Sequence, residues 1–187
     1  LKHNSAGIGR LKVSPVGADT DGDGDFDKLY SFGARSFSIW STSGARVFDS
    51  GQQLEEITGQ AYPDHFNAGS TNNTIDDRSD DKGPEPEGVT VASLFGRPYI
   101  FVMLERIGGV VIYEASNPAA PRFVTYVNTR DITVADPEEP EPGEHPGDLG
   151  PEAARFVPAE ESPNGRPLLI VSNEVSGSLR VFEIESR

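Results

Sequence analysis

The chain has 187 residues, no cysteine and a formal net charge of −14, which comes from 30 acidic residues against 16 Lys and Arg. This acidic balance argues against nucleic acid as a partner and for cations, and the absence of cysteine excludes disulfides and thiolate metal sites. No apolar run approaches the roughly 18 residues that a membrane span needs, so we expect no transmembrane helix.

The first conspicuous feature in chain order is an acidic segment in which every second residue is an aspartate. Ca²⁺ prefers about six to eight oxygen ligands, and alternate aspartates on a tightly turning loop supply them. The segment matches the first nine positions of an EF-hand loop, with glycines at positions 22 and 24 of the chain. Its candidate ligands are Asp19, Asp21 and Asp23, with Asp25 as a backbone carbonyl donor and Asp27 at the water-mediated position.

The match to an EF-hand ends at the twelfth position, where Tyr30 replaces the bidentate glutamate and the next residues alternate like a strand. We therefore expect a calcium loop between two strands. A solvated acidic turn is the alternative, although like charges this close repel unless a cation neutralises them. Because weak calcium sites are saturated outside the cell and not in the cytosol, the loop favours an extracellular or cell-surface location.

β signals dominate the rest of the chain, and we expect no amphipathic helix. Short apolar or alternating runs between Gly, Pro, Asn and Asp predict strands at 10–14, 28–32, 36–41, 46–49, 88–93, 99–104, 109–114, 122–128, 153–158, 168–173 and 178–184. The runs 99–104 and 168–171 are apolar on both faces, so they should be central strands. The polar stretches 58–86 and 131–150 should be surface loops.

An internal repeat with an offset of 69 residues organises the second half of the chain. The Gly-Arg-Pro motif at 96–98 recurs at 165–167, Glu105 recurs as Glu174, and Tyr113 recurs as Phe182. A fainter third copy includes residues 36–40 and 45–49. Each copy predicts a four-stranded antiparallel sheet of the kind that forms a propeller blade, with chance similarity of β-rich segments as the alternative.

The repeat predicts an all-β fold, a partial β-propeller of about three blades at 8–51, 83–128 and 150–185. The last unit has only three expected strands, and a propeller as a rule needs at least four blades. We therefore expect residues 1–187 to be the C-terminal part of a larger propeller, whose remainder is their first partner. The chain's first residues are no signal peptide, which fits a mature or internal portion. A β-sandwich with long loops is the alternative.

A second set of carboxylates stands near the ends of the predicted strands, so that they would converge at one mouth of the propeller. The set comprises Glu85, Glu87, Glu105, Glu152 and Glu174. Such a ring can hold divalent cations that polarise a phosphoryl oxygen, and neighbouring cations can neutralise a phosphate; these are Arg35, Arg78, Lys82 and Arg106. Alternatively, the carboxylates accept hydrogen bonds from backbone or arginine groups at blade corners.

Several motifs together resemble the choice-of-anchor I domain family over nearly the whole chain. They lie at residues 10–13, 19–25, 30–40, 48–51, 77–88 and 104–109. This family is similar to the sea-urchin mesenchyme-specific cell surface glycoprotein. The resemblance implies a β-propeller-like domain of several hundred residues, secreted and held at microbial surfaces by varied C-terminal anchors. Members are often labelled alkaline phosphatase-like, and relatives are associated with biomineralisation.

Two functional hypotheses follow from these observations. The first is a non-enzymatic, calcium-stabilised surface propeller that acts in adhesion, envelope structure, or contact with mineral or surface polymers. The second is a calcium-dependent, alkaline phosphatase-like phosphomonoesterase that hydrolyses phosphate esters at the glutamate ring. The sequence offers no nucleotide-binding or hydrolase motif, and no nucleophile or base is identified for the second hypothesis, so we favour the first.

Overall fold

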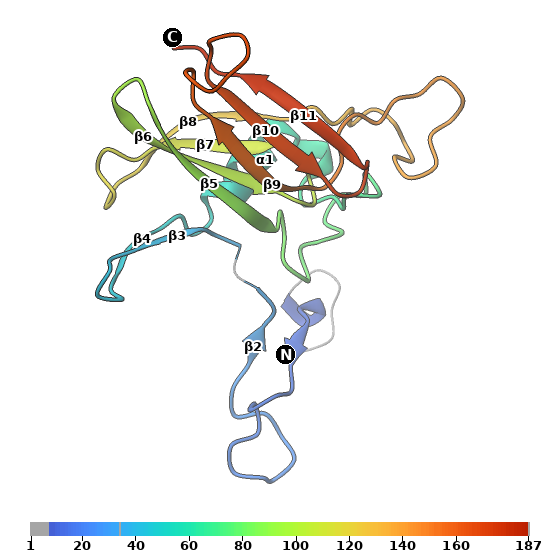
Figure 1. Cartoon of the computed structure of the whole chain (residues 1–187). Helices are drawn as coiled ribbons and strands as arrows, with labels where there is room; N and C mark the ends of the chain where they lie inside the picture. The colour runs from blue at the N-terminus through green and yellow to red at the C-terminus, as the bar shows by residue number, and fades with distance from the viewer. Residues whose placement is uncertain (1–7, 34, 187) are drawn as a thin grey trace.

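The computed structural model describes residues 8–33 and 35–186, whose regular secondary structure consists mainly of β-strands (Figure 1). The largest sheet has the strand order β5–β6–β7–β8. Its strands are β5 (Pro86–Leu94), β6 (Arg97–Leu104), β7 (Val110–Glu114) and β8 (Arg122–Val127). A three-stranded sheet has the order β11–β10–β9, with β9 (Pro151–Val157), β10 (Leu168–Asn173) and β11 (Ser178–Glu183). Both sheets are antiparallel, and every strand lies where the sequence pattern predicts one.

The N-terminal part contains two separate two-stranded ribbons, not the single blade-like unit expected at 8–51. A short 3-10 helix, η1 (Ile8–Arg10), precedes the pair of β1 (Val13–Ser14) and β2 (Tyr30–Ser31), and β3 (Ser38–Trp40) pairs with β4 (Arg46–Asp49). The first ribbon contacts the long loop rather than the second ribbon, because Lys12 N, just before β1, donates to Asp80 O at 2.9 Å. Residues 8–33, here called the N-terminal finger, project away from the two larger sheets (Figure 1).

A helix stands where the sequence pattern predicts only loop. α1 (Gln53–Ala61) follows β4 almost directly, and a 3-10 turn, η2 (Pro63–His65), follows α1. The helical signal is weak, because only Leu54 and Thr58 are buried and the helix contains Gly59, a poor helix former. Packing against the sheet, not intrinsic propensity, therefore stabilises α1. Among the described residues, no helix is both long and apolar enough to cross a membrane.

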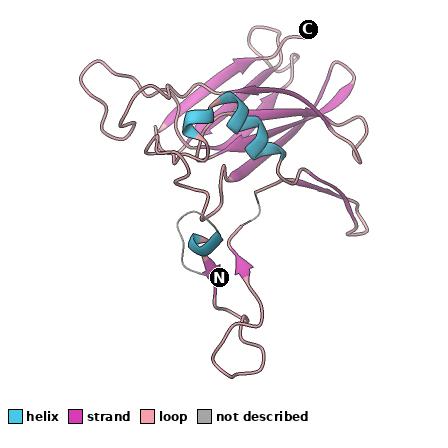
Figure 2. Ribbon diagram, turned by 180° about the vertical axis from the view of Figure 1, so that it is seen from behind, coloured by secondary structure: helices cyan, strands magenta, loops and turns pink. Residues whose placement is uncertain are grey.

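The α1 helix and the two larger sheets form three layers (Figures 1 and 2). One core cluster joins Leu54 of α1 to the face of the β5–β8 sheet that carries Val102 and Tyr113. A second cluster joins the opposite face, with Phe101 and Met103, to the β9–β11 sheet. β6 is therefore buried on both faces, which confirms the expectation for 99–104.

The first three strands of the β5–β8 sheet and the three strands of the β9–β11 sheet repeat the same pairing pattern. Tyr99 pairs with Glu114 in the first sheet, and Leu168 pairs with Glu183 in the second, so the register is kept across the 69-residue offset. A register shift also recurs, next to the pairs Pro86–Leu104 and Pro151–Asn173. The bulge places Glu152 in the position of Glu87. The repeat is thus confirmed, whereas none of the described sheets closes into a ring.

The two sheets approach each other most closely between their first strands. A Cβ added at Gly88 of β5 would lie 2.0 Å from the backbone oxygen of Glu152 in β9. Close by, Thr90 Oγ1 donates to Ala154 O at 2.6 Å. Glycine at position 88 is therefore required because no side chain fits between the two backbones.

We predict that Gly88→Ala destabilises the protein by about 2 kcal/mol or more, because the obstructing atom is backbone and cannot rotate away. Denaturant unfolding followed by circular dichroism measures this change. Gly59→Ala is the matched control: its Cβ would meet only the ring of Phe66 at 3.0 Å, and alanine favours the helix. Equal stability of the Gly88→Ala variant and the wild type would contradict the close approach of β5 and β9.

Candidate functional site

The aspartate loop at the tip of the N-terminal finger is shaped by its own carboxylates. Asp19 accepts hydrogen bonds from the backbone N–H groups of Gly22 at 2.6 Å and Gly24 at 3.1 Å. Both glycines have positive φ angles, 82° and 96°, which other residues rarely adopt. The hydrogen bond from Lys28 N to Ala18 O closes the loop at its base. The sequence Asp-Gly-Asp-Gly-Asp therefore forms a tight turn with carboxylates on it.

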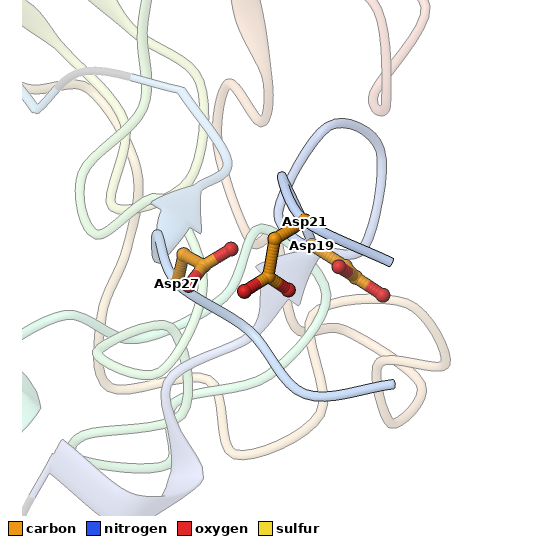
Figure 3. Close-up of side chains that lie close together, drawn as sticks. All are labelled: Asp19, Asp21 and Asp27. Atoms are coloured by element: carbon orange, nitrogen blue, oxygen red, sulfur yellow. The ribbon is translucent and has the colours of Figure 1, made fainter. Parts of the chain in front are cut away.

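Three of the five predicted aspartates meet in this turn. Oxygen atoms of Asp19, Asp21 and Asp27 all lie within 4.8 Å of one another, and all three residues are exposed (Figure 3). Asp23 and Asp25 lie outside this group; Asp23 instead accepts the N–H of Asp25 at 3.1 Å. The donor set consists only of oxygen atoms on one concave turn, which suits a hard divalent cation.

Asp27 lies at the other end of the loop, and hydrogen bonds from Thr20 hold its carboxylate near Asp19 and Asp21. Its Oδ2 accepts the Thr20 hydroxyl at 2.6 Å and the Thr20 backbone N–H at 2.8 Å. These hydrogen bonds to Thr20 lower the pKa of the Asp27 carboxyl below its ordinary value. The group is therefore held in its charged form, which is the form that binds a metal ion.

A second carboxylate group brings together Glu85, Glu87 and Glu105, whose oxygen atoms also lie within 4.8 Å of one another. Glu85 ends the long loop with a positive φ of 54°, Glu87 lies in β5, and Glu105 follows β6. The backbones are joined here as well, since Glu105 N donates to Glu85 O at 3.0 Å. The register shift at the start of β5 thus turns Glu85 and Glu87 towards the end of β6.

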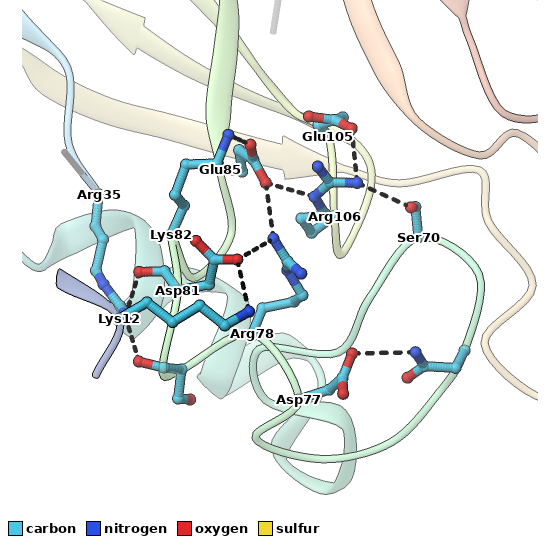
Figure 4. Close-up of polar contacts among 12 residues, drawn as sticks. Lys12, Arg35, Ser70, Asp77, Arg78, Asp81, Lys82, Glu85, Glu105 and Arg106 are labelled. Atoms are coloured by element: carbon cyan, nitrogen blue, oxygen red, sulfur yellow. Dashed lines mark hydrogen bonds and ion pairs between the residues drawn. The ribbon is translucent and has the colours of Figure 1, made fainter. Parts of the chain in front are cut away.

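Three cations surround the buried Glu85 carboxylate (Figure 4). Lys82 and Arg106 form ion pairs with its two oxygens, and Arg78 Nη2 lies 3.5 Å from Glu85 Oε2. Arg106 also pairs with Glu105 at 2.8 Å. The charge of the buried Glu85 is therefore compensated by the protein's own side chains. Because the Glu85 carboxylate is buried, leaving it without these cations would be strongly destabilising.

Glu105 is the member of this group with the most altered acidity. Burial, together with a hydrogen bond to Glu87, raises the pKa of the Glu105 carboxyl to about 7, despite the opposing charge of Arg106. Glu87 is exposed whereas Glu105 is buried. Glu105 is therefore the carboxyl of this group that can take up or release a proton near neutral pH.

The other predicted site residues lie elsewhere in the structure. Glu152 in β9 and Glu174 after β10 occupy repeat positions in the second sheet, are exposed, and lie outside the carboxylate group. Arg35 pairs with Glu55 of α1 at 2.7 Å and donates to Asp81 O at 3.1 Å. Arg35 therefore attaches the helix to the loop next to the glutamates and makes no ion pair with them.

One buried residue near the glutamates has no signal in the sequence. Arg130 is buried, and its guanidinium donates to four oxygens, the carbonyls of Gly69, Arg106 and Asn72 and the side chain of Asn73. Burial lowers the pKa of Arg130 to about 10. Because these acceptors come from two distant segments, Arg130 holds the long loop against Arg106, and only the folded chain reveals this.

Comparison with known proteins finds one family and two relatives. The family described as the choice-of-anchor I domain matches residues 2–118. Gigasin-3a of Magallana gigas is 34% identical over 191 aligned positions, which cover 98% of this chain and 66% of that protein. The mesenchyme-specific cell surface glycoprotein of Strongylocentrotus purpuratus is 26% identical over 105 positions, 49% of this chain and 14% of that protein. No solved structure matches the chain.

The raised pKa of Glu105 predicts a pH dependence of stability with a definite sign. Its folded pKa of about 7 exceeds the ordinary 4.5, so between these values the folded state holds a proton that the unfolded chain has lost. This contribution, of order 1–3 kcal/mol, is complete below pH 4.5 and is lost as the pH rises through 7. Glutamine at position 105 is permanently neutral. The Glu105→Gln variant should therefore melt at a higher temperature than the wild type at pH 8, and at about the same temperature as the wild type at pH 5.

Glu174→Gln is the control for this experiment, because Glu174 holds the same repeat position in the second sheet and is exposed. We expect its melting temperature to follow the wild type at both pH values. Thermal unfolding by calorimetry at pH 5 and pH 8 provides the measurement. A Glu105→Gln variant that loses stability equally at both pH values would show that Glu105 acts through its charge.

Proposed function

Because the chain belongs to the choice-of-anchor I domain family, we propose that it is part of an extracellular or cell-surface protein that binds calcium at the aspartate loop. The proposed role of calcium is structural, with no catalytic step. It would stiffen the N-terminal finger for contact with an adhesion partner, a surface polymer or mineral. The name of one relative, a cell surface glycoprotein, supports the proposed location.

The meeting of Asp19, Asp21 and Asp27 within 4.8 Å is the single observation that carries the calcium proposal. Three carboxylates this close repel one another in water by about 1 kcal/mol for each pair. A bound divalent cation would convert this repulsion into attraction. Thr20 and the backbone N–H groups of Gly22 and Gly24 hold the carboxylates in place, so little further ordering is needed on binding.

We also propose that the two larger sheets are adjacent blades of a β-propeller that includes further sheets. Their shared register, their shared bulge and the short approach at Gly88 support this arrangement. A β-sandwich ordinarily packs two sheets around one core, with the outer faces in solvent. Here the β5–β8 sheet is covered on both faces, as a propeller blade is.

The phosphomonoesterase hypothesis receives less support from the same contacts. Its glutamates are neutralised by Arg78, Lys82 and Arg106, so these cations are already engaged and are less available to a phosphate. Ser70, the hydroxyl nearest to Arg106, is buried. The glutamate group fits better as a junction between the long loop and the sheet, in which Glu105 makes stability depend on pH.

We predict that calcium raises the melting temperature of the protein. With about 10 mM calcium and a dissociation constant of about 0.1–1 mM, the expected stabilisation is about 1.4–2.7 kcal/mol, or about 3–10 °C. Asp19→Asn/Asp21→Asn should abolish the effect, because it removes two anionic ligands while it keeps one carbonyl acceptor for the turn at each position. Thermal unfolding in calcium and in chelator, with calorimetric titration of the ion, measures both quantities.

The control is Glu138→Gln/Glu139→Gln, which removes the same charge from the exposed 131–150 loop. This variant should retain the full response to calcium, so a loss caused by net charge alone would be detected. Identical melting curves in calcium and in chelator, together with no heat of binding, would refute the calcium proposal. They would leave the proposed arrangement of the sheets untouched.

A further inference from the structure

The outer face of the β9–β11 sheet carries apolar side chains that nothing in the described structure covers. Leu179 is 72% exposed and Val181 is 54% exposed, both on β11. Leu179 lies opposite Ser172 in β10, and Val181 lies opposite Ile170, so these residues share one face of the sheet. Neighbouring apolar residues this exposed on one face are typical of an interaction surface.

The repeat gives these residues buried counterparts in the first sheet. Because the pairing register is the same 69 residues apart, Leu179 corresponds to Val110, Val181 to Ile112 and Ile170 to Phe101. Val110 is only 3% exposed and Phe101 only 1%. They pack in the second core cluster against Leu169 and Val171 of β10. Equivalent positions are therefore buried in one sheet and exposed in the other.

The contact between the two sheets joins unlike faces. The face of β9–β11 that receives Phe101 and Val110 carries Leu169 and Val171. In the first sheet, the face equivalent to this receiving face carries Ile100 and Val102, and it is covered by Leu54 of α1. When sheets pack in this way, each sheet uses one face to contact the next sheet and the opposite face to receive the previous one. The last sheet of the series therefore keeps its first kind of face, here called the donating face, uncovered. That free face is the one with Leu179 and Val181.

We propose that this face packs against a further antiparallel β-sheet of the same polypeptide, outside the 187 residues, in the way that the β5–β8 sheet packs on β9–β11. Both receiving faces within the described residues are occupied, so a second copy of the chain offers no free face of this kind. The length of one relative also leaves room for the sheet, since the matched region covers 66% of that protein. The inference rests on the proposed propeller arrangement and not on the calcium site.

Cysteine labelling tests this inference directly, because the 187 residues contain no cysteine. The experiment uses the full-length product of the gene, with any cysteine outside these residues replaced by serine. Leu179→Cys and Val181→Cys are compared with Val16→Cys, an 82% exposed control, and Val110→Cys, a buried control. The reaction of each thiol with a maleimide dye is followed over time, and circular dichroism confirms that each variant is folded.

We expect the thiols at 179 and 181 to react at least about tenfold more slowly than the thiol at 16, and this protection should persist on dilution. Reaction at 179 and 181 as fast as at 16 would overturn the inference. Protection that disappears on dilution would also overturn it, because the cover would then be a second molecule. Since both thiols lie far from the aspartate loop in sequence, these outcomes are independent of the response to calcium.

Discussion

The close packing of β5 against β9 is the contact on which the rest of the structure depends. At Gly88 the two strands approach so closely that no side chain fits between them. This approach sets the spacing of the two sheets, and the second core cluster fills the space behind it. Glu87 directly precedes Gly88 in β5. The carboxylate group therefore lies next to the contact between the two sheets.

The distribution of charge follows from the same arrangement. The chain has few cations, and several of them are used at the junction between the long loop and the sheet, where Arg78, Lys82 and Arg106 neutralise Glu85. The outer acidic segments, the aspartate loop and the 131–150 loop, keep most of their negative charge. A protein built in this way presents a negative surface to its surroundings, which attracts divalent cations before any specific site is filled.

The sequence predicts those parts of the structure whose signals are local or repeated. The strands were predictable because alternation and turn residues are local signals, and the shared register followed from the 69-residue offset between Glu105 and Glu174. The meeting of Asp19, Asp21 and Asp27 was predictable for the same reason, since all three lie in one turn. The helix α1 was not, because its stability comes from packing of Leu54 on a sheet that follows later in the chain. Nor was Arg130, whose four acceptors come from distant segments.

The slender attachment of the N-terminal finger determines how the molecule would respond to mechanical load. Within the finger, β1 and β2 form two residue pairs and Lys28 N donates to Ala18 O. The finger contacts the body through the ion pairs Arg10–Asp76 and Lys12–Asp81 and the backbone hydrogen bond from Lys12 to Asp80. A pull on its tip would therefore separate these few polar contacts long before it disturbed the three layers behind them. On a surface exposed to flow, such a finger would act as a compliant link that yields first and spares the folded sheets.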